Sequence, residues 1–312
     1  MSNKENFYQN LIEKIGEDQI LRDEPLANHT SFKVGGPAYF VVLPKTIDQV
    51  IHTINACKAY NMPFYVIGRG SNLLVSDQGY EGTIIKLDGD FSDVSIEPFS
   101  IEHGSYLVRA KAGISLDKLA DIIAREGLVG FEFASGIPGT LGGAVTMNAG
   151  AYGGEIKDCI YRVKALDKEC KLISLDKDEL ELGYRTSIIQ KEGYIVLEVE
   201  FVFESGDPEE IFDKINDLNN RRKEKQPLEY PSAGSTFKRP EGYFAGKLIM
   251  DSDLQGFTIG GAQVSTKHCG FIINTGDATA KDIYELICHI KAVVQDKFGV
   301  NLEQEVKMLG KF

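Results

Sequence analysis

Apolar residues recur along the chain with two different periods, three to four residues in some segments and two in others. In residues 3–16, Phe7, Leu11 and Ile15 are four apart, which predicts an amphipathic helix. Segments with alternating polarity and short apolar runs are typical of strands. Strands are predicted at 38–43, 63–68, 82–87, 94–112, 160–166, 171–175 and 194–204. Strand, helix and strand therefore follow one another in the first 90 residues, an order typical of an α/β region.

Capping residues mark where several helices begin and end. Thr46 is followed three residues later by Gln49, a capping-box pattern that predicts a helix to about residue 60. Ser115 is predicted to begin a helix that Gly127 ends. A last helix is predicted over 279–299, again with a capping box at its start and a glycine at its end.

A shift in composition near residue 206 indicates a domain boundary. The sequence SGDP at 205–208 precedes a highly charged predicted helix that runs to about residue 225. A chain of 312 residues is long enough for two or three domains. The tail alternates apolar and polar residues, which predicts a strand that returns to an earlier domain. The expected domains are 1–90 joined by 301–312, then 91–206, then 207–300.

Composition narrows the functional classes. A formal net charge of −12 and a pI near 5.0 argue against a nucleic-acid surface, which needs clustered Lys and Arg. The first ten residues lack the pattern of a signal peptide, and no apolar run reaches the roughly 20 residues that span a membrane. The cysteines are odd in number and form no CxxC pair, so we expect reduced thiols, a cytoplasmic protein and no metal site. They are Cys57, Cys159, Cys170, Cys269 and Cys288.

The segment 135–154 is the strongest candidate for ligand binding. It contains seven glycines and no charged side chain, so we expect it to be buried and to form neither an ordinary helix nor a strand. Backbone of this kind can approach a large cofactor closely. A tight structural loop between core elements is the alternative. The residues expected within reach of a ring system or a phosphate are Pro138, Gly139, Gly142, Gly143, Asn148 and Ala149.

A second candidate follows the predicted strand 63–68. It contains a G-x-G turn, but Leu73 stands where the dinucleotide-binding fingerprint has its third glycine, and no helix pattern follows. Closely spaced backbone N–H groups in such a turn suit a diphosphate. A polar β-turn is the alternative. The turn consists of Gly68, Arg69, Gly70, Ser71 and Asn72, and another glycine pair, Gly35 and Gly36, precedes the first strand.

Three further segments carry polar groups that could take part in chemistry. Arg185 in LGYRTS would, by itself, be read as an ordinary surface arginine. The loop 230–240 gathers hydroxyl and basic side chains, which suits an anion site, with a polar loop as the alternative. In the tail, Glu303 and Glu305 are two residues apart and are expected to share one face of a strand. A carboxylate on a strand is more often solvated than catalytic.

Taken together, the motifs occur in a specific order: SFKVGGPA, GRGSNLLVSD, GIPGTLGGAVTMNAGAYGGEI, YRTS, AGSTFKRP and LEQEV. In this order and at these intervals the chain resembles the UDP-N-acetylenolpyruvoylglucosamine reductase family from about residue 20 to the end. The resemblance is to the shorter type of that family, without an extra tyrosine-bearing loop. It implies an α+β fold: an FAD-binding unit of the vanillyl-alcohol-oxidase (PCMH) type with two subdomains, 1–90 and 91–206, and an α+β substrate-binding domain, 207–300.

The resemblance also implies roles for individual residues. The catalytic residues would be Arg185, Ser235 and Glu305. The substrate-binding residues would be Tyr184, Lys238, Arg239 and Gln263. The FAD-binding residues would be Lys33, Gly35, Gly36, Gly68, Arg69, Gly70, Ser71, Asn72, Pro138, Gly139, Gly142, Gly143, Asn148 and Ala149.

The implied activity is reduction of an enolpyruvyl ether to a lactyl ether in peptidoglycan precursor synthesis, with NADPH and non-covalent FAD. Hydride addition leaves negative charge beside the substrate carboxylate, which Arg185 would stabilise. Glu305, if burial keeps it protonated, would donate a hydrogen bond to that charge. Ser235 would supply the proton to carbon, helped by a cation such as Lys238.

The expected partners are UDP-N-acetylglucosamine enolpyruvate and NADPH, which would take turns in one pocket of a monomer. No nucleic acid, membrane or metal is expected. Two other readings remain. One is a flavin-dependent alcohol or phenol oxidase of the same fold, although the turn at 68–72 offers no His or Cys to tether a flavin. The other is a non-catalytic nucleotide-sugar binding protein.

Overall fold

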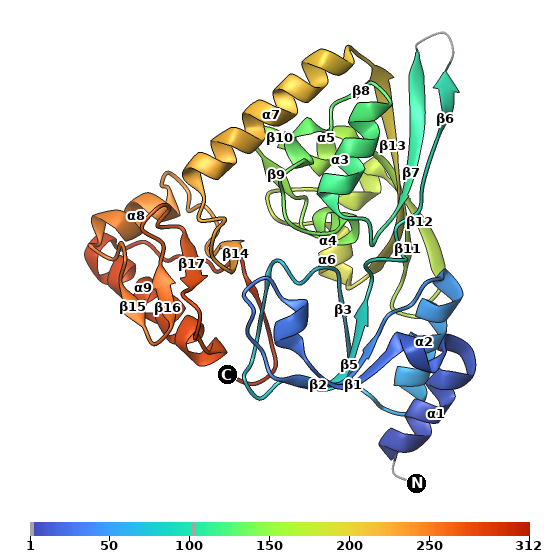
Figure 1. Cartoon of the computed structure of the whole chain (residues 1–312), viewed down its shortest axis with the longest axis horizontal. Coiled ribbons are helices and arrows are strands. Elements are labelled where there is room, and N and C mark those ends of the chain that lie inside the picture. Colours follow the sequence, from blue (N-terminus) through green and yellow to red (C-terminus); the bar gives the residue numbers. More distant parts are fainter. Residues whose placement is uncertain (1–2, 101–103) are drawn as a thin grey trace. The chain divides into compact units, whose positions relative to one another are not determined.

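The computed structural model describes residues 3–100 and 104–312 (Figure 1). The chain forms two compact units, each assembled from separate segments. Unit 1 contains the residues up to 21 together with 41–68 and 83–222, and unit 2 contains 22–40, 69–82 and 223–312. Strands β1 (Ile20–Pro25), β2 (Pro37–Val42) and β5 (Tyr80–Lys86) run from one unit into the other.

An antiparallel sheet forms the centre of unit 1. Its strands lie in the order β12 (Leu172–Asp176), β11 (Ile160–Leu166), β13 (Ile195–Ser205), β7 (Ser105–Lys111) and β6 (Val94–Ser100), and β8 (Leu128–Val129) also pairs with β13. These strands confirm the strand segments predicted over 94–112, 160–166, 171–175 and 194–204 for the residues that the structure describes.

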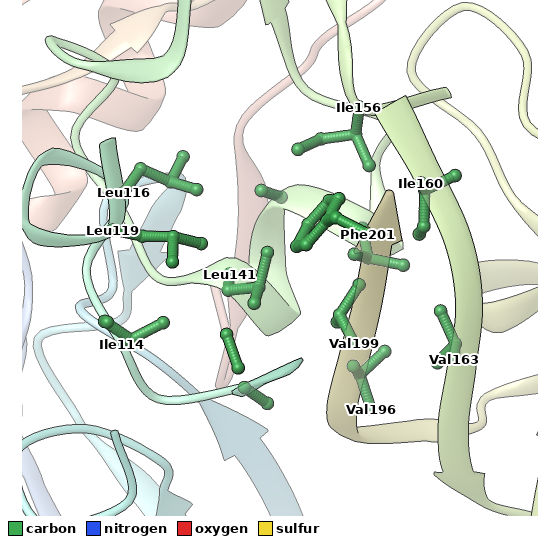
Figure 2. Packing of buried hydrophobic residues seen from close by; sticks show 14 of the residues in the cluster. Ile114, Leu116, Leu119, Leu141, Ile156, Ile160, Val163, Val196, Val199 and Phe201 are labelled. Carbon is green, nitrogen blue, oxygen red and sulfur yellow. The ribbon is translucent and has the colours of Figure 1, made fainter. Parts of the chain in front are cut away.

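One face of this sheet carries the larger core of unit 1. In Figure 2 this core runs from Leu119 of α3 (Leu116–Arg125) through Leu141 of α4 (Leu141–Thr146) to Phe201 of β13 and Val163 of β11. These side chains are almost completely buried. The remaining short helices of this part are α5 (Ile156–Cys159) and α6 (Ile188–Glu192), and α7 (Pro208–Lys225) follows β13.

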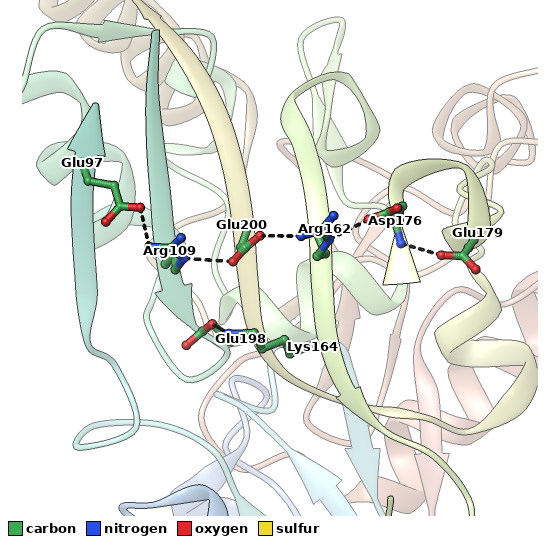
Figure 3. Close-up of polar contacts among 8 residues, drawn as sticks. All are labelled: Glu97, Arg109, Arg162, Lys164, Asp176, Glu179, Glu198 and Glu200. Carbon is green, nitrogen blue, oxygen red and sulfur yellow. Dashed lines mark hydrogen bonds and ion pairs between the residues drawn. The ribbon is translucent and has the colours of Figure 1, made fainter. Parts of the chain in front are cut away.

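The opposite face of the same sheet carries a row of ion pairs (Figure 3). Arg109 contacts Glu97 at 2.8 Å and Glu200 at 2.9 Å, each on a neighbouring strand. Arg162 lies 3.8 Å from Glu200 and 2.6 Å from Asp176. Glu200 is only 6% exposed, between the two arginines. This row of ion pairs lies on the outer face of the sheet. The helices α3 and α4 and the glycine-rich segment pack against the other, apolar face.

The N-terminal part of unit 1 contains α1 (Asn3–Ile15), α2 (Ile47–Ala59) and β3 (Phe64–Ile67), and β3 pairs in parallel with residues 83–86 of β5. The predicted helix over 3–16 is confirmed, with Phe7, Leu11 and Ile15 buried. The capping box at Thr46 is half correct. Thr46 accepts from the Gln49 N–H at 3.2 Å, but the Gln49 carboxamide oxygen accepts from Lys45 N–H instead of the Thr46 N–H.

Two other predicted caps gave different outcomes. The helix α3 begins after Ser115 and is followed by Gly127 at φ +67°, as predicted, but the Ser115 side chain makes no capping hydrogen bond. The capping box of Thr279 and Asp282 is complete at α9 (Ala280–Phe298), and Gly299 ends that helix at φ +67°. A left-handed backbone favours glycine at these two ends.

In unit 2, a four-stranded sheet in the order β14 (Ser232–Ser235), β17 (Phe271–Asn274), β16 (Ala262–Val264) and β15 (Thr258–Ile259) shares a core with α8 (Ala245–Asp251) and α9. Phe32 and Val34, from the segment SFKVGG, are buried in the same core. The tail forms the strand β18 (Lys307–Leu309), which pairs in parallel with β4 (Leu73–Val75).

The glycine-rich segment differs from its prediction in two respects. Residues 141–146 form the helix α4, because the Gly142 N–H donates to the Ala112 carbonyl at 2.8 Å and Leu141 packs in the core. Tertiary contacts here outweigh the low helix propensity of glycine. The segment was also predicted to be buried, yet one edge of it is exposed. The exposed residues are Pro138, Gly143, Tyr152 and Gly153.

Candidate active site

The glycine-rich segment of unit 1 presents uncharged backbone at its surface. Gly139 adopts φ +149° and its carbonyl accepts from the Leu116 N–H at 3.1 Å, so contacts within the protein account for this glycine. Gly143 differs: it is exposed on α4, and an added Cβ would meet only the Thr140 hydroxyl, at 3.8 Å. Packing within the protein does not demand glycine at 143, so the position fits a ligand that needs the space.

The turn after β3 also packs very closely on other parts of the chain. A Cβ on Gly68 would lie 1.9 Å from the Thr140 hydroxyl oxygen, so this glycine lets the turn pack on the glycine-rich segment within unit 1. In unit 2, Gly70 has φ +61° and a Cβ there would lie 2.2 Å from the His29 carbonyl. Arg69 is exposed, and Ser71 and Asn72 are half-buried.

One polar atom beside this turn has no partner within the described chain. The Ser31 N–H donates to the Gly70 carbonyl at 3.3 Å, but the Ser31 hydroxyl is buried without a hydrogen bond. A buried hydroxyl of this kind is costly unless a ligand or water satisfies it. The donors of this turn and this hydroxyl suit the phosphates or ribityl chain of FAD. Sequence reasoning missed Ser31, whose only signal was its place in SFKVGG, two residues before Lys33.

The segment SFKVGG is folded by its own backbone. Lys33 is exposed and adopts φ +59°. The Gly35 and Gly36 carbonyls accept from the Ala27 and Leu26 N–H groups at 3.1 Å. A Cβ on Gly36 would lie 2.2 Å from the Asp77 carbonyl oxygen. Both glycines are thus required by close packing inside unit 2, whatever they contact besides.

Arg185 lies at the tip of a tight turn in unit 1. The N–H and C=O groups of Gly183 and Thr186 bond to each other, which leaves Tyr184 and Arg185 projecting, with Arg185 at φ +54°. Its guanidinium donates to the Gly150 carbonyl at 3.4 Å and lies 5.3 Å from the centre of the Tyr184 ring. A non-glycine residue in this backbone region is uncommon and indicates a constrained position.

Two buried side chains fix this turn against the glycine-rich segment. Ser187 donates to the Thr146 carbonyl at 2.6 Å and accepts from the Gln190 N–H, so it also caps α6. Asn148 is 1% exposed, and its amide donates to the Gly183 carbonyl at 2.9 Å and to Glu155 at 2.7 Å. The predicted cofactor residue Asn148 therefore has protein partners, and Ser187 is a positioning residue that sequence reasoning missed.

Unit 2 brings together three chain segments around Ser235. The Glu305 N–H donates to the carbonyl of Thr236, the neighbour of Ser235, at 2.9 Å. The Asn72 amide donates to the Glu305 carbonyl at 3.2 Å. Ser235 is exposed, whereas Glu305 is 9% exposed. The hydroxyl, the buried carboxyl and one residue of the glycine turn thus belong to one local cluster.

The expected pairing of Glu303 and Glu305 on one face is wrong. Glu303 is exposed and forms an ion pair with Lys238, while Glu305 is buried. The cause is that the tail is not a regular strand at these residues; only Lys307–Leu309 is. Lys238 was expected to assist Ser235, but its ammonium group forms an ion pair with Glu303 instead.

The other expected substrate contacts lie at several places. Tyr184 is exposed in unit 1. In unit 2, Arg239 is exposed and its guanidinium stacks 4.0 Å from the centre of the Phe244 ring. Gln263 lies on β16 and donates to the Gly256 carbonyl at 3.3 Å. Arg185 belongs to unit 1, and Ser235, Glu305, Lys238, Arg239 and Gln263 belong to unit 2.

Comparison with known proteins identifies the family to which this chain belongs. Residues 38–176 match an FAD-binding domain model, and residues 226–309 match the model of the UDP-N-acetylenolpyruvoylglucosamine reductase C-terminal domain. A reductase of that name from Lachnoclostridium phytofermentans is 54% identical over 97% of this chain and 96% of its own. The chain belongs to the UDP-N-acetylenolpyruvoylglucosamine reductase family.

Further relatives agree with this family membership. The reductase from Alkaliphilus oremlandii is 55% identical over 97% of each chain. The crystal structure of the reductase (MurB) from Thermus caldophilus is 34% identical, with a TM-score of 0.76, over 92% of this chain and 98% of that one. The α+β fold with its FAD-binding domain is thereby confirmed, as is FAD as cofactor.

The structure adds two further observations about ligands. Across residues 3–100 and 104–312, no three His, Cys, Asp or Glu side chains are grouped as a metal ion would require. No helix in this described part is both long and apolar enough to cross a membrane.

Proposed function

We propose that this protein reduces the enolpyruvyl ether of UDP-N-acetylglucosamine enolpyruvate to UDP-N-acetylmuramate, as a step in peptidoglycan precursor synthesis. When bound, FAD supplies the hydride, which it takes from NADPH. Membership of the reductase family over nearly the whole chain supports the reaction. The observation that carries the residue assignment is the cluster in unit 2, where backbone bonding holds Glu305 beside the strand that ends in Ser235.

Arg185 would bind the carboxylate of the enolpyruvyl group. Its permanent charge and forked donors match a carboxylate, and they stabilise the negative charge that develops on the adjacent carbon. The turn that carries Arg185 is held by Ser187 and Asn148, so the guanidinium is oriented before substrate arrives. Preorganised charge of this kind lowers the barrier without a cost of reorganisation during the reaction.

Ser235 would donate its hydroxyl proton to the carbon that carries the developing charge. Its exposure on β14 leaves the hydroxyl accessible to a substrate. Glu305, which is buried and bonded through its backbone N–H to Thr236, would hydrogen-bond the enolate in its protonated form. The predicted cofactor residues, together with Ser31, would bind FAD. NADPH and the UDP-sugar would alternate in one pocket of a cytoplasmic monomer.

The proton-donor assignment can be tested by replacing Ser235 with alanine. NADPH should still bleach the flavin absorbance of the S235A holoprotein, while turnover to product falls by roughly 10²–10⁴ because the general acid is missing. Ser232→Ala, on the same strand, is the matched control and should keep parental turnover. Parental turnover in S235A would disprove the assignment of Ser235.

The same protein preparation separates the two competing functions. An oxidase with a tethered flavin would keep its colour on the polypeptide after acid denaturation and filtration. A non-catalytic binding protein would bind the UDP-sugar but show no substrate-dependent NADPH oxidation. The proposed reductase should release its flavin and oxidise NADPH only when the enolpyruvyl substrate is present.

A further inference from the structure

Arg222 is an almost fully buried arginine that the roles above leave unexplained. It lies on α7 and is 5% exposed. Its guanidinium fills the space beside Gly136, since a Cβ on that glycine would lie 1.8 Å from the Arg222 Nη1 atom. The same guanidinium lies 5.5 Å from the centre of the Tyr152 ring. Arg222 thus contacts both ends of the glycine-rich segment, and all three residues belong to unit 1.

The charge of Arg222 is not matched by an acid. Among the ion pairs of the described residues, none joins Arg222 to a carboxylate, whereas its neighbour Arg221 pairs with Asp217 at 2.8 Å. Burial lowers the pKa of the Arg222 guanidinium from its usual value, and the Tyr152 phenol is its polar partner. Arginine nevertheless stays protonated at neutral pH. Burying a cation without a counter-charge costs several kcal/mol of folding free energy. A residue with only a packing role would cost less if its side chain were apolar.

The surroundings of Arg222 fit an anionic ligand rather than a missing acid of the protein. Tyr152 is 41% exposed and lies at the tip of the β9 (Gly150–Ala151) and β10 (Gly154–Glu155) hairpin, so the ring that the guanidinium contacts reaches the surface of the segment. No acidic side chain occurs within residues 135–154. The guanidinium has five N–H donors, so it can bind phosphate oxygens and still contact the Tyr152 phenol.

We propose that Arg222 binds a phosphate group of a nucleotide ligand that lies along the glycine-rich segment. Two ligands of this protein carry the required chemistry, the diphosphate of FAD and the diphosphate of the UDP-sugar. The inference rests on FAD binding by the domain at 38–176, which contains Gly136 and Tyr152 but not Arg222 itself. Arg222 would therefore extend the nucleotide site beyond the matched FAD-binding domain.

The test compares phosphate-bearing ligands with their phosphate-free counterparts. Arg222→Met removes the charge while keeping an unbranched apolar side chain, and Arg221→Met on the same helix is the matched control because Arg221 is exposed. In one arm, protein loaded with FAD, or with riboflavin in its place, is diluted and filtered, and the fluorescence of the free flavin gives each dissociation constant. In the other arm, equilibrium dialysis of FAD-saturated protein measures UDP and uridine.

We expect R222M to weaken FAD or UDP by roughly 10- to 100-fold, which is the usual loss of a charged hydrogen bond. Riboflavin and uridine should bind as they do to the parent protein, and R221M should change none of the four. Loss in the FAD arm assigns the cofactor phosphates, and loss in the UDP arm assigns those of the substrate. Equal weakening of phosphate-bearing and phosphate-free ligands would overturn the proposal, because a distorted site affects both.

A second variant covers the case in which R222M does not fold. Arg222→Gln is neutral but keeps hydrogen-bonding groups for the Tyr152 phenol, and it should show the same selective loss. FAD and UDP binding within twofold of the parent in the folded variant would refute a phosphate contact. Failure of the parent protein itself to bind FAD or UDP would instead contradict the proposed function.

Discussion

Replacing Asn148 by aspartate should make both the stability and the activity of this protein depend on pH. The Asn148 amide nitrogen donates to Glu155 at 2.7 Å and to the Gly183 carbonyl at 2.9 Å, while its oxygen accepts from the Lys157 N–H at 3.0 Å. In N148D the donor becomes an oxygen that faces two acceptors. Asparagine and aspartate have nearly the same shape, but this substitution replaces a hydrogen-bond donor by an acceptor.

The size of the effect follows from the burial of the site. An ionised Asp at this 1%-exposed position would face the Glu155 carboxylate, so burial and like charge both raise its pKa above the ordinary value of about 3.9. Leaving an uncompensated charge buried costs about 3–5 kcal/mol, so a loss of stability of that size is expected at pH 8. Because the raised pKa favours the protonated folded state, the loss should be small near pH 4, should grow as pH rises from the ordinary pKa to the raised value, and should level off above it. A protonated carboxyl can donate to only one of the two acceptors, so about 1 kcal/mol is lost even at low pH.

Urea unfolding followed by far-ultraviolet circular dichroism between pH 5 and 8 measures this loss, since the chain has no tryptophan. Asn61→Asp is the matched control, because Asn61 is exposed and also adopts a positive φ, of 51°. The kcat of N148D should fall over the same pH range, because Gly183 adjoins the turn that carries Arg185. An unfolding midpoint for N148D that matches the parent at pH 8 would refute the reasoning about this network.

Three further predictions test other parts of the structure. Asp77→Ala should cost about 1–2 kcal/mol of unfolding free energy by thermal melting, because the Asp77 carboxylate accepts from the Ala280 and Lys281 N–H groups, at 2.8 and 2.9 Å, at the start of α9. Asp296→Ala, at an exposed position of α9 itself, should cost little. Gly143→Ala should stabilise the protein by about 0.5–1 kcal/mol yet weaken FAD roughly tenfold or more by fluorescence titration, and unchanged FAD affinity would contradict a ligand over α4. Burial raises the pKa of Cys57 to about 12, so a thiol reagent at pH 8 should modify the exposed Cys288 and leave Cys57 intact by peptide mass analysis.

Local sequence signals were sufficient where the hydrogen bonds themselves are local. The start of α9 is set by Thr279 and Asp282, which bond to each other's backbone, and its end by Gly299 in a left-handed conformation. The alternating apolar residues of β13 likewise required one face to be buried. The ordered motifs then identified the reductase family and its FAD cofactor, since each motif is long and their order is specific.

Contacts between distant segments were beyond the reach of local signals. The glycine-rich helix α4 forms because Gly142 bonds to Ala112 and Leu141 packs in the core, against the intrinsic preference of its residues. Asp77 caps a helix that begins about 200 residues later in the chain. Neither partner is visible from the other in the sequence, since only folding brings them together.

For this protein, the amino-acid sequence by itself determined the helices and strands with local caps or clear periodicity, the family and the cofactor. The tertiary structure alone decided which polar groups are buried and what they bond. Glu305 and Glu303 have the same chemistry and nearly the same place in the tail, yet one is buried beside Thr236 and the other is exposed on Lys238. The physical reason is that burial and hydrogen bonding depend on neighbours contributed by remote segments, and these neighbours determine how a carboxyl, an amide or a guanidinium behaves.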